Sequence, residues 1–508
     1  MKYNIINWVK ENKLIIILFL ISTSFFIYQH HTNLSWDFSS YVLNAEYWFQ
    51  NGNYFEPLRP PLMPFIIGIF SFLGSRTAEF IFIILTSLLL FYSSIKLAKS
   101  LNFNETAFYA ISLNFYLLGK GLINGTELLS LAFLELFVAF LIKNKSISGL
   151  FLGLSAVSRY TALVLFPLII LHLKIKKVVK SLIIFTIPIL IWLIYNYYKF
   201  GNLFTSIADQ YANNILFREY LRQQIKLIDF IFTINVLIPF LITGIIVSIY
   251  YITKKIKENN KLLQKIESLK VEIIFFILLI FSLYNYINTP IKDARYLFTI
   301  LLPAFYFSYL ALDFIVNKLN KKEILVKAAL IIFTISIILL LIPTPLTIRE
   351  STSHYYSAIE KIEELNLTHC SIKTNSWVFI NYISDKSTSP LPRYEIVNKT
   401  IKEKHILVMF KNVGEPEYIK NITFINSLPI IYNNSDYHII GENNCIKEAK
   451  FEESYLEQTQ KALIETRNIT INIDPCFILF SKNKLPEKAC NLINLNGFKT
   501  SENRESAI

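Results

Sequence analysis

Long apolar runs alternate with short charged loops along the first two-thirds of the chain. A helix needs roughly 20 apolar residues to cross a hydrocarbon core about 30 Å thick. Several runs are shorter, so we expect polar flanking residues to lie in the headgroup zone or the bilayer to thin locally. The pattern predicts a polytopic α-helical membrane protein. The runs with almost no charge are 14–28, 80–95, 181–198, 230–252 and 325–342.

Most of the lysines in this part of the chain lie in alternate loops between these runs. Residues 1–343 hold 31 Lys and Arg against 17 Asp and Glu, whereas residues 344–508 hold 19 against 20. The formal charge of +13 therefore belongs to the membrane part and does not indicate nucleic-acid binding. The alternation is the positive-inside pattern, which places the N-terminus in the cytoplasm. The lysine-rich loops are 2–13, 96–99, 143–145, 174–180, 254–270 and 318–327.

About eleven spans satisfy both the apolar runs and the charge alternation, with spans five and six short enough to form a hairpin that dips partway. An odd number places the C-terminus outside the plasma membrane. The first apolar run lacks a small-residue cleavage site, so we interpret it as a retained anchor. The predicted spans are 14–28, 78–95, 104–120, 127–142, 146–157, 160–173, 181–198, 229–252, 271–287, 296–316 and 324–343.

A separate domain is predicted after the proline pair at 343 and 345, which divides the chain into 1–343 and 344–508. All four cysteines lie in the second part, which fits two disulfides in an oxidising compartment, with three pairings open. Five Asn-X-Ser/Thr sequons also lie there. The domain is therefore expected on the extracytoplasmic face. The cysteines are Cys370, Cys445, Cys476 and Cys490, and the sequons begin at Asn366, Asn398, Asn421, Asn433 and Asn468.

Short apolar runs in this tail predict a small α/β domain. Helices are expected over 354–365 and 448–466. Strands are expected at 370–372, 406–410, 422–425, 437–440 and 477–480.

The loop after the first span is expected to carry interfacial helices within residues 29–77. Tyr41, Ala45 and Trp48 recur at helical spacing, which favours an amphipathic helix along the membrane surface. Pro60 and Pro61 then begin a second segment, over 62–73, that is too short to cross.

Candidate chemistry gathers on the outer side. Asp37 follows the first span in an aromatic setting, where a carboxylate can accept a proton from a sugar hydroxyl. A solvated loop residue is the alternative interpretation. Six of ten outer-side basic residues are Arg, whose guanidinium binds phosphate in a bidentate fork. Glu135, deep in a span, is either functional or packed against a partner. His30 and His31 are interpreted as interfacial anchors rather than metal ligands.

A series of motifs, in this order and topology, resembles the GT-C glycosyltransferases, and within them the protein O-mannosyltransferase and aminoarabinose-transferase-like group. The resemblance covers most of residues 14–316, and each motif is weak alone. The motifs are Asp37; Tyr41 and Ala45; Asn51-Gly52-Asn53-Tyr54; Arg59-Pro60-Pro61-Leu62 with Pro64; Glu127; Ser158-Arg159-Tyr160; Asn196-Tyr197-Tyr198 with Phe200-Gly201-Asn202; and Asp293-Ala294-Arg295-Tyr296-Leu297.

The resemblance implies a role for each matching residue. Asp37 matches the catalytic base, and Glu127 matches the acid of the second outer loop that helps position acceptor or base. Many members carry a second acid beside the first, where this chain has Phe38. No cofactor is predicted, and this departure leaves the use of a divalent metal open. The residues matched to the lipid-linked phosphate are Arg59, Arg295, Arg159 and Tyr296.

The function implied is an inverting glycosyltransferase. A sugar, mannose or another hexose, would pass from a polyprenyl or dolichyl phosphate in the membrane to a glycan, lipid or protein acceptor on the outer face. No Gly-rich phosphate loop appears, so no nucleotide sugar is expected. A transporter or flippase of lipid-linked sugars and an inactive accessory homologue are the alternatives. High Ile, Lys and Asn together with the sequons favour an archaeal source.

Overall fold

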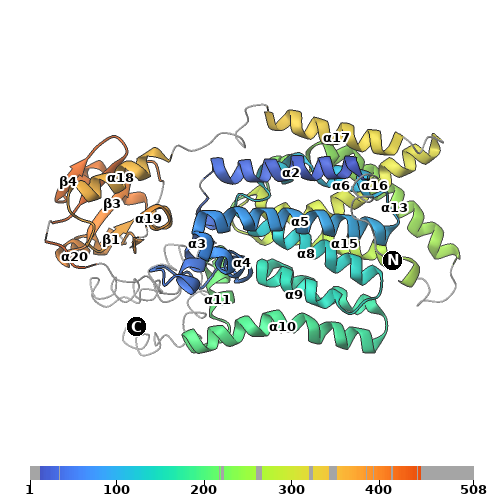
Figure 1. Ribbon diagram of the computed structural model, residues 1–508, viewed down its shortest axis with the longest axis horizontal. Helices are drawn as coiled ribbons and strands as arrows, with labels where there is room; N and C mark the ends of the chain where they lie inside the picture. Colours follow the sequence, from blue (N-terminus) through green and yellow to red (C-terminus); the bar gives the residue numbers. More distant parts are fainter. Residues whose placement is uncertain are drawn as a thin grey trace.

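The computed structural model describes residues 12–447, except 34, 217, 219–221, 259–265, 320–323, 342–351, 385, 393, 414–415 and 443. A bundle of long helices is followed by a smaller α/β tail domain at one end of the bundle (Figure 1). The predicted boundary at 343 and 344 lies outside the described residues, as do the expected helix over 448–466, the expected strand at 477–480, Cys476, Cys490 and Asn468.

Seven described helical segments are long and apolar enough to cross a membrane. They confirm the predicted polytopic helical architecture, because each coincides with one of the predicted spans. Four are single helices: α2 (Lys13–Thr32), α5 (Ser75–Leu101), α10 (Ile175–Phe200) and α15 (Lys270–Asn288). The other three are α12 (Leu227–Ile234) continued through η5 (Asn235–Leu237) into α13 (Ile238–Glu258), η6 (Ala294–Ile300) continued into α16 (Leu301–Lys318), and α17 (Ile324–Leu341).

The four remaining expected spans form shorter elements. The segment expected over 104–120 is broken into two helices, because the Asn114 side chain accepts the N–H of Leu117 at 2.9 Å and donates to the Thr233 carbonyl at 2.9 Å. That cap starts a new helix within the bundle. The elements are α6 (Glu105–Ser112), α7 (Phe115–Lys120), α8 (Thr126–Ile142), α9 (Ser148–Ser158) and the 3₁₀ helix η2 (Tyr160–His172).

Two short helices lie between the bundle and the tail, in the segment that is expected to carry interfacial helices, and we call them the interfacial layer (Figure 1). Helix α3 (Trp36–Phe49) begins where the Ser35 side chain accepts the N–H of Phe38 at 3.4 Å. Helix α4 (Leu62–Phe70), continued by η1 (Ser71–Leu73), starts after the proline pair and packs against α3. A further short helix, α11 (Thr205–Tyr211), lies beside them.

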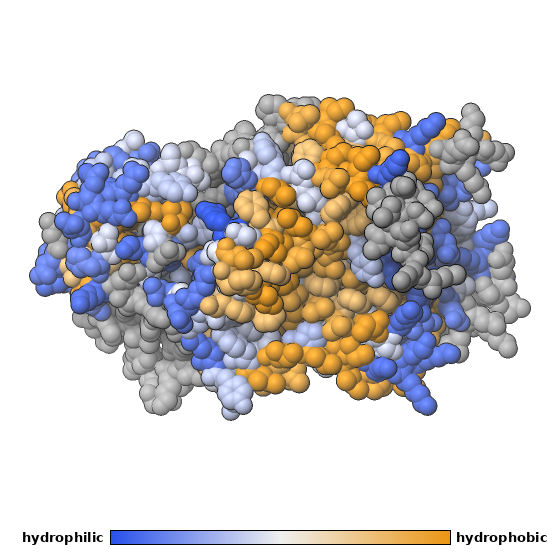
Figure 2. Space-filling model, viewed as in Figure 1, coloured by the Kyte–Doolittle hydropathy of each residue, from blue (hydrophilic) through white to orange (hydrophobic). Residues whose placement is uncertain are grey.

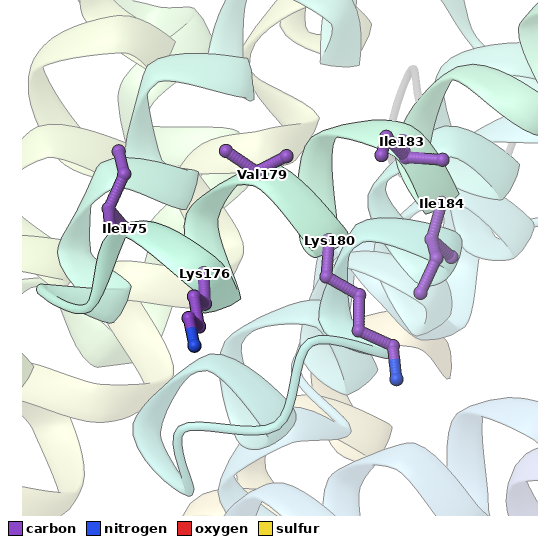
Figure 3. Close-up of a pocket in the computed structure, with 6 residues that line it drawn as sticks. All are labelled: Ile175, Lys176, Val179, Lys180, Ile183 and Ile184. Atoms are coloured by element: carbon purple, nitrogen blue, oxygen red, sulfur yellow. The ribbon is translucent and has the colours of Figure 1, made fainter.

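On the face seen in Figure 2, the bundle surface is largely apolar, whereas the tail is mostly hydrophilic. At the start of α10, Lys176 and Lys180 lie one turn apart beside exposed aliphatic side chains (Figure 3). Lysine stems can cover apolar surface while the ammonium groups reach the headgroup zone. Together with the span lengths, this surface identifies an integral membrane protein. The aliphatic side chains are Ile175, Val179, Ile183 and Ile184.

The tail is built around a five-stranded mixed sheet of order β2-β1-β3-β5-β4. β1 pairs in parallel with β2 and β3, and β5 pairs antiparallel with β3 and β4. A helix pair covers each face, as an α/β domain requires to bury both faces of its sheet. The strands are β1 (Ile372–Thr374), β2 (Ser389–Pro390), β3 (Ile406–Phe410), β4 (Ile430–Asn433) and β5 (Tyr437–Ile440).

Alternating side chains of β3 face the two helical layers. Ile406 and Val408 pack with α18 (Ser353–Glu364) and α19 (Trp377–Ser384), while Leu407 and Met409 pack with α20 (Val397–Lys402) and α21 (Ile422–Asn426). All five residues of β3 are buried, which explains its continuous apolar sequence. The one-turn 3₁₀ helices are η7 (Tyr394–Ile396) and η8 (Glu417–Lys420).

The structure decides several expectations for the tail. Helix α18 and strands β3 and β5 confirm the elements expected over 354–365, 406–410 and 437–440. Cys370 and Cys445 form a disulfide with their Cα atoms 5.5 Å apart. The strand expected at 422–425 is wrong, because this segment is helix α21, capped where the Asn421 side chain accepts the N–H of Phe424 at 3.1 Å.

The bundle contains close helix crossings that a glycine permits. A Cβ atom at Gly244 of α13 would lie 1.8 Å from the Phe307 carbonyl oxygen of α16. Small residues allow two backbones in a membrane to approach this closely. The backbone oxygen cannot move aside as a flexible side chain would.

We predict that Gly244→Ala forces α13 and α16 apart and lowers the free energy of unfolding by about 2 kcal/mol. Thermal unfolding of the purified protein in detergent measures the change. Ile242→Ala is the control, since Ile242 lies on the same helix and its side chain is 55% exposed. An equal loss in the two variants would contradict the close-packing explanation.

Candidate functional site

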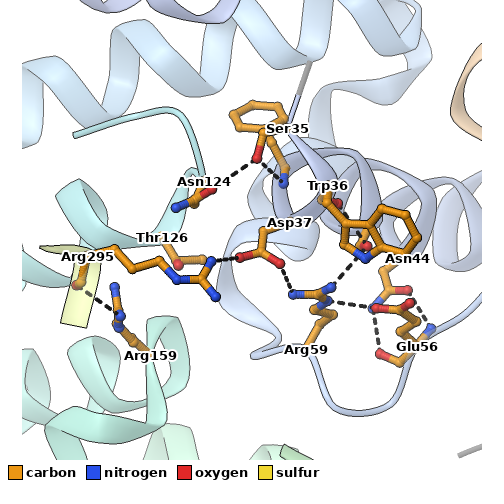
Figure 4. Close-up of polar contacts among 12 residues, drawn as sticks. Ser35, Trp36, Asp37, Asn44, Glu56, Arg59, Asn124, Thr126, Arg159 and Arg295 are labelled. Carbon is orange, nitrogen blue, oxygen red and sulfur yellow. Dashed lines mark hydrogen bonds and ion pairs between the residues drawn. The ribbon is translucent and has the colours of Figure 1, made fainter. Parts of the chain in front are cut away.

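Asp37 lies between two guanidinium groups at the tail end of the bundle (Figure 4). Its Oδ1 accepts a hydrogen bond from Arg59 Nη1 at 2.6 Å, and its Oδ2 accepts one from Arg295 Nη1 at 2.7 Å. The three residues come from α3, the loop before α4, and η6. The fold therefore brings Arg295 into contact with the carboxylate of Asp37, which lies 258 residues earlier in the chain.

The pKa of Asp37 reflects two opposed effects. Burial raises the pKa above its ordinary value of 3.8, but the charges of Arg59 and Arg295 outweigh burial and hold it well below that value. The position of Asp37 in the first turn of α3 also favours a negative charge, because N–H dipoles point toward it. Asp37 is consequently a stable anion in this arrangement.

Each of the three guanidinium nitrogens of Arg59 donates a hydrogen bond to the protein. Besides Asp37, it donates from Nε to Glu56 Oε2 at 2.8 Å and from Nη2 to Ser40 Oγ at 3.2 Å. Its pKa is raised because the nearby carboxylates outweigh the opposing effect of burial. Arg59 thus holds Asp37 in place from one side.

Glu56 is an important residue that the sequence analysis missed. Its side chain is buried, and its backbone is fixed to α3 because Asn44 donates to the Glu56 carbonyl at 2.9 Å and accepts its N–H at 2.8 Å. Tyr54 donates a further hydrogen bond to Glu56 Oε1. The sequence does contain a signal for Glu56, because this acid lies three residues before Arg59, and Arg59 is assigned to the site from the sequence.

Glu127 pairs with Arg159 on the other side of the site, with Oε1 and Nη1 2.7 Å apart. Glu127 lies in the first turn of α8, which begins at Gly125 with φ of 85°. A Cβ atom at Gly125 would lie 2.3 Å from Met63 of α4. The glycine therefore allows the start of α8 to approach the interfacial layer.

A small cavity lies beside these residues. Its volume is about 10 Å³, close to the minimum that one water molecule requires. Among the described residues, the buried Arg295 Nε has no hydrogen-bond partner, and Arg159 Nη1 meets Glu127 without an aligned hydrogen bond. The lining is Glu127, Ser130, Arg159, Thr161, Asn285, Arg295, Tyr296, Phe298 and Thr299.

All six residues assigned to the site from the sequence lie in this region. Asp37, Arg59 and Arg295 form one ion-paired chain, while Glu127, Arg159 and Tyr296 line the cavity with Arg295. Arg159 also donates to the Arg295 carbonyl at 3.4 Å, which joins the two groups.

Two other candidates lie outside the site. Glu135 accepts hydrogen bonds from Ser93 and Ser94 at 2.6 and 2.8 Å, so it packs between α8 and α5. His30 pairs with Glu79 at 2.7 Å and packs on Phe38.

The donor set does not fit a divalent metal. The carboxylates of Asp37, Glu56 and Glu127 each contact a guanidinium group rather than converging on a common point. Within the described part of the chain, the one group of three His, Cys or acidic ligand atoms comprises His369, Cys370 and Cys445, and its cysteines are joined in the disulfide.

No protein-family model and no curated protein matches the sequence. Two crystal structures of ArnT from Cupriavidus metallidurans match the fold. The structure bound to undecaprenyl phosphate has a TM-score of 0.54 and 9% identity, covering 85% of this chain and 98% of that one. The apo structure has a TM-score of 0.56 and 11% identity, with coverage of 85% and 97%. The chain has a GT-C fold.

The GT-C fold accounts for both parts of the molecule, because the matched 85% of the chain exceeds the bundle alone. The expected resemblance is thereby confirmed for the fold. At 9 to 11% identity the likeness establishes architecture, and the chemistry has to come from the site itself.

The doubly paired carboxylate gives a stability prediction. Asp37→Asn leaves two guanidinium groups facing a neutral amide, and we expect it to lower the free energy of unfolding by about 2 kcal/mol. The folded-state pKa is depressed, so the stabilisation is present above the unfolded value near 3.8 and is lost as pH falls toward the folded value.

The difference in free energy of unfolding between the unaltered protein and Asp37→Asn should therefore stay constant from about pH 8 to about pH 5. It should shrink below about pH 4. Thermal unfolding across this range measures it. Glu403→Gln, which removes an exposed pair with Lys399, is the control and should change stability by less than about 1 kcal/mol. A difference that disappears near neutral pH would show that Asp37 is not held ionised.

Proposed function

We propose that the protein is a glycosyltransferase that transfers a sugar from a polyprenyl phosphate carrier to an acceptor hydroxyl with inversion. The observation that carries this proposal is the cavity at Arg159 and Arg295, which adjoins a carboxylate held ionised. Guanidinium N–H groups are suited to phosphate oxygens, and the Nε of Arg295 has no hydrogen-bond partner among the described residues. An ionised carboxylate within reach is suited to accept a proton.

The fold supports the same class of donor. ArnT, a GT-C glycosyltransferase, has been crystallised with undecaprenyl phosphate. The proposed donor class for this chain is therefore a polyprenyl phosphate sugar. The sequence resemblance extends the proposal to a hexose such as mannose, with dolichyl phosphate as one carrier, and to glycan, lipid or protein acceptors.

In the proposed reaction, the acceptor oxygen attacks the anomeric carbon while its proton passes to Asp37. The bond between that carbon and the phosphate oxygen breaks, and its electron pair leaves with the polyprenyl phosphate. Arg295 and Arg159, with Tyr296 beside them, stabilise the charge that develops on the phosphate. Arg59, which the sequence resemblance matched to the phosphate, holds Asp37 in this arrangement, and Glu127 orients Arg159.

The cavity is too small for a sugar, so donor binding must open the Asp37–Arg295 pair. A phosphate that takes up the Arg295 donors would free one carboxylate oxygen for the acceptor. The proposed topology places this end of the bundle on the extracytoplasmic face. Lysine-rich loops would lie on the cytoplasmic side and the disulfide in an oxidising compartment.

The test uses purified protein in proteoliposomes with dolichyl phosphate mannose as the probe. We expect consumption of the lipid-linked sugar by the unaltered protein. Asp37→Asn should abolish transfer while binding of the carrier persists, and Arg295→Lys should lower the transfer rate by about 100-fold, since it removes aligned phosphate donors. Release of free dolichyl phosphate measures the reaction.

Arg76→Lys is the matched control, because Arg76 lies at the same end and its side chain is 62% exposed. Full activity of Asp37→Asn would remove Asp37 from the mechanism. Movement of the intact lipid-linked sugar between leaflets, without release of the carrier, would instead support a flippase. Carrier binding without turnover of any donor would support an accessory protein.

A further inference from the structure

One hydrogen bond from the tail domain reaches the residues that surround the site. Trp377, the first residue of α19, donates its indole N–H to Tyr54 Oη at 2.8 Å. Tyr54 is buried and donates to Glu56, which in turn accepts from Arg59. Arg59 then donates to Asp37. A continuous series of hydrogen bonds thus connects the tail to the candidate base.

Each link in this series is fixed by surrounding structure. The Trp377 ring meets Trp36 edge-on, with ring centroids 4.5 Å apart, and its carbonyl accepts from Thr388 at 3.1 Å. Tyr54 packs in a small cluster with Leu43 and Val378. Tyr54 and Val378 are buried, and close packing restricts the positions that a buried side chain can take.

The direction of the hydrogen bonds in this series affects their strength. The Tyr54 hydroxyl accepts one hydrogen bond and donates another, and a hydroxyl that accepts becomes a better donor. Glu56 is then held with both oxygens occupied, one by Tyr54 and one by Arg59. The orientation of the Arg59 fork, and through it of Asp37, therefore depends on a residue of the tail.

We propose that Trp377 and Tyr54 are positioning residues, through which the docked tail domain orients Asp37 for proton transfer. This inference rests on the proposed function. It differs from a general docking role, because the tail makes other contacts that do not enter the series. Tyr382 of α19 donates to Glu79 at 2.9 Å, and Ser387 donates to the Asn53 carbonyl at 3.1 Å.

A double-mutant cycle on the full-length protein tests the proposal. Trp377→Phe removes the indole N–H but keeps an aromatic ring, and Tyr54→Phe removes the hydroxyl that joins Trp377 to Glu56. We expect kcat for dolichyl phosphate mannose to fall about fivefold in the first and about tenfold in the second, with little change in KM. The double variant should be no slower than Tyr54→Phe, because residues in one series are coupled.

Tyr382→Phe is the matched control. It removes the hydrogen bond from α19 to Glu79 but leaves the series intact. Its effect on kcat should therefore be the same whether Tyr54 is present or replaced. Additive effects of Trp377→Phe and Tyr54→Phe on kcat, or a change confined to KM, would overturn the proposal. If Tyr382→Phe lowers kcat as much as Trp377→Phe does, the tail contacts contribute only to docking. That result would also overturn the proposal.

Two further measurements separate this proposal from the proposed function. If the unaltered protein neither binds undecaprenyl phosphate nor releases dolichyl phosphate, the proposed function fails and the positioning role fails with it. If it does both and the cycle on kcat is additive, only the positioning role fails. The same cycle on thermal unfolding shows whether the hydrogen bonds between Trp377, Tyr54 and Glu56 are coupled in the folded protein.

Discussion

The site depends on one carboxylate held between two guanidinium groups at the edge of an apolar bundle. An unpaired carboxylate there would gain a proton rather than stay charged, since burial disfavours the anion. Arg59 and Arg295 reverse that preference for Asp37. The pairing also joins α3, the following loop and η6, so the ion pairs define how the interfacial layer is placed on the spans.

The surrounding structure restrains the guanidinium groups of Arg59 and Arg295 differently. Arg59 is held at all three guanidinium nitrogens, by Glu56, Asp37 and Ser40, so it can serve as a fixed support. Arg295 keeps a buried N–H without a partner among the described residues and borders the cavity. The two residues were assigned the same role from sequence, yet their surroundings suit one to positioning and the other to binding. Only the geometry distinguishes them.

The sequence predicted the membrane architecture well because span length and low charge follow directly from the bilayer. It predicted the gathering of Asp37, Arg59, Glu127, Arg159, Arg295 and Tyr296 because each belongs to a motif in a known order. Their catalytic roles stay predictions. Glu56 was not found, since its importance depends on the Asn44 contact that folds its loop back onto α3.

Local errors also have physical causes. Residues 422–425 are β-branched and aromatic enough to favour a strand, but the Asn421 cap and burial against β3 favour one turn of helix. Short apolar runs do not distinguish these outcomes. The break in the segment 104–120 depends on a contact from Asn114 to Thr233, a residue distant in sequence. Trp377 is likewise 323 residues from Tyr54, so no local pattern relates them.

The charge balance of the site explains how a strongly held anion could act as a base. Three carboxylates, of Asp37, Glu56 and Glu127, face three guanidinium groups, of Arg59, Arg159 and Arg295. Under the proposed function, a polyprenyl phosphate sugar adds one negative charge and competes for the Arg295 donors. Both effects raise the pKa of Asp37 toward the range useful for proton transfer. The free protein would then keep its base inactive, and the donor itself would make Asp37 basic when an acceptor can be used.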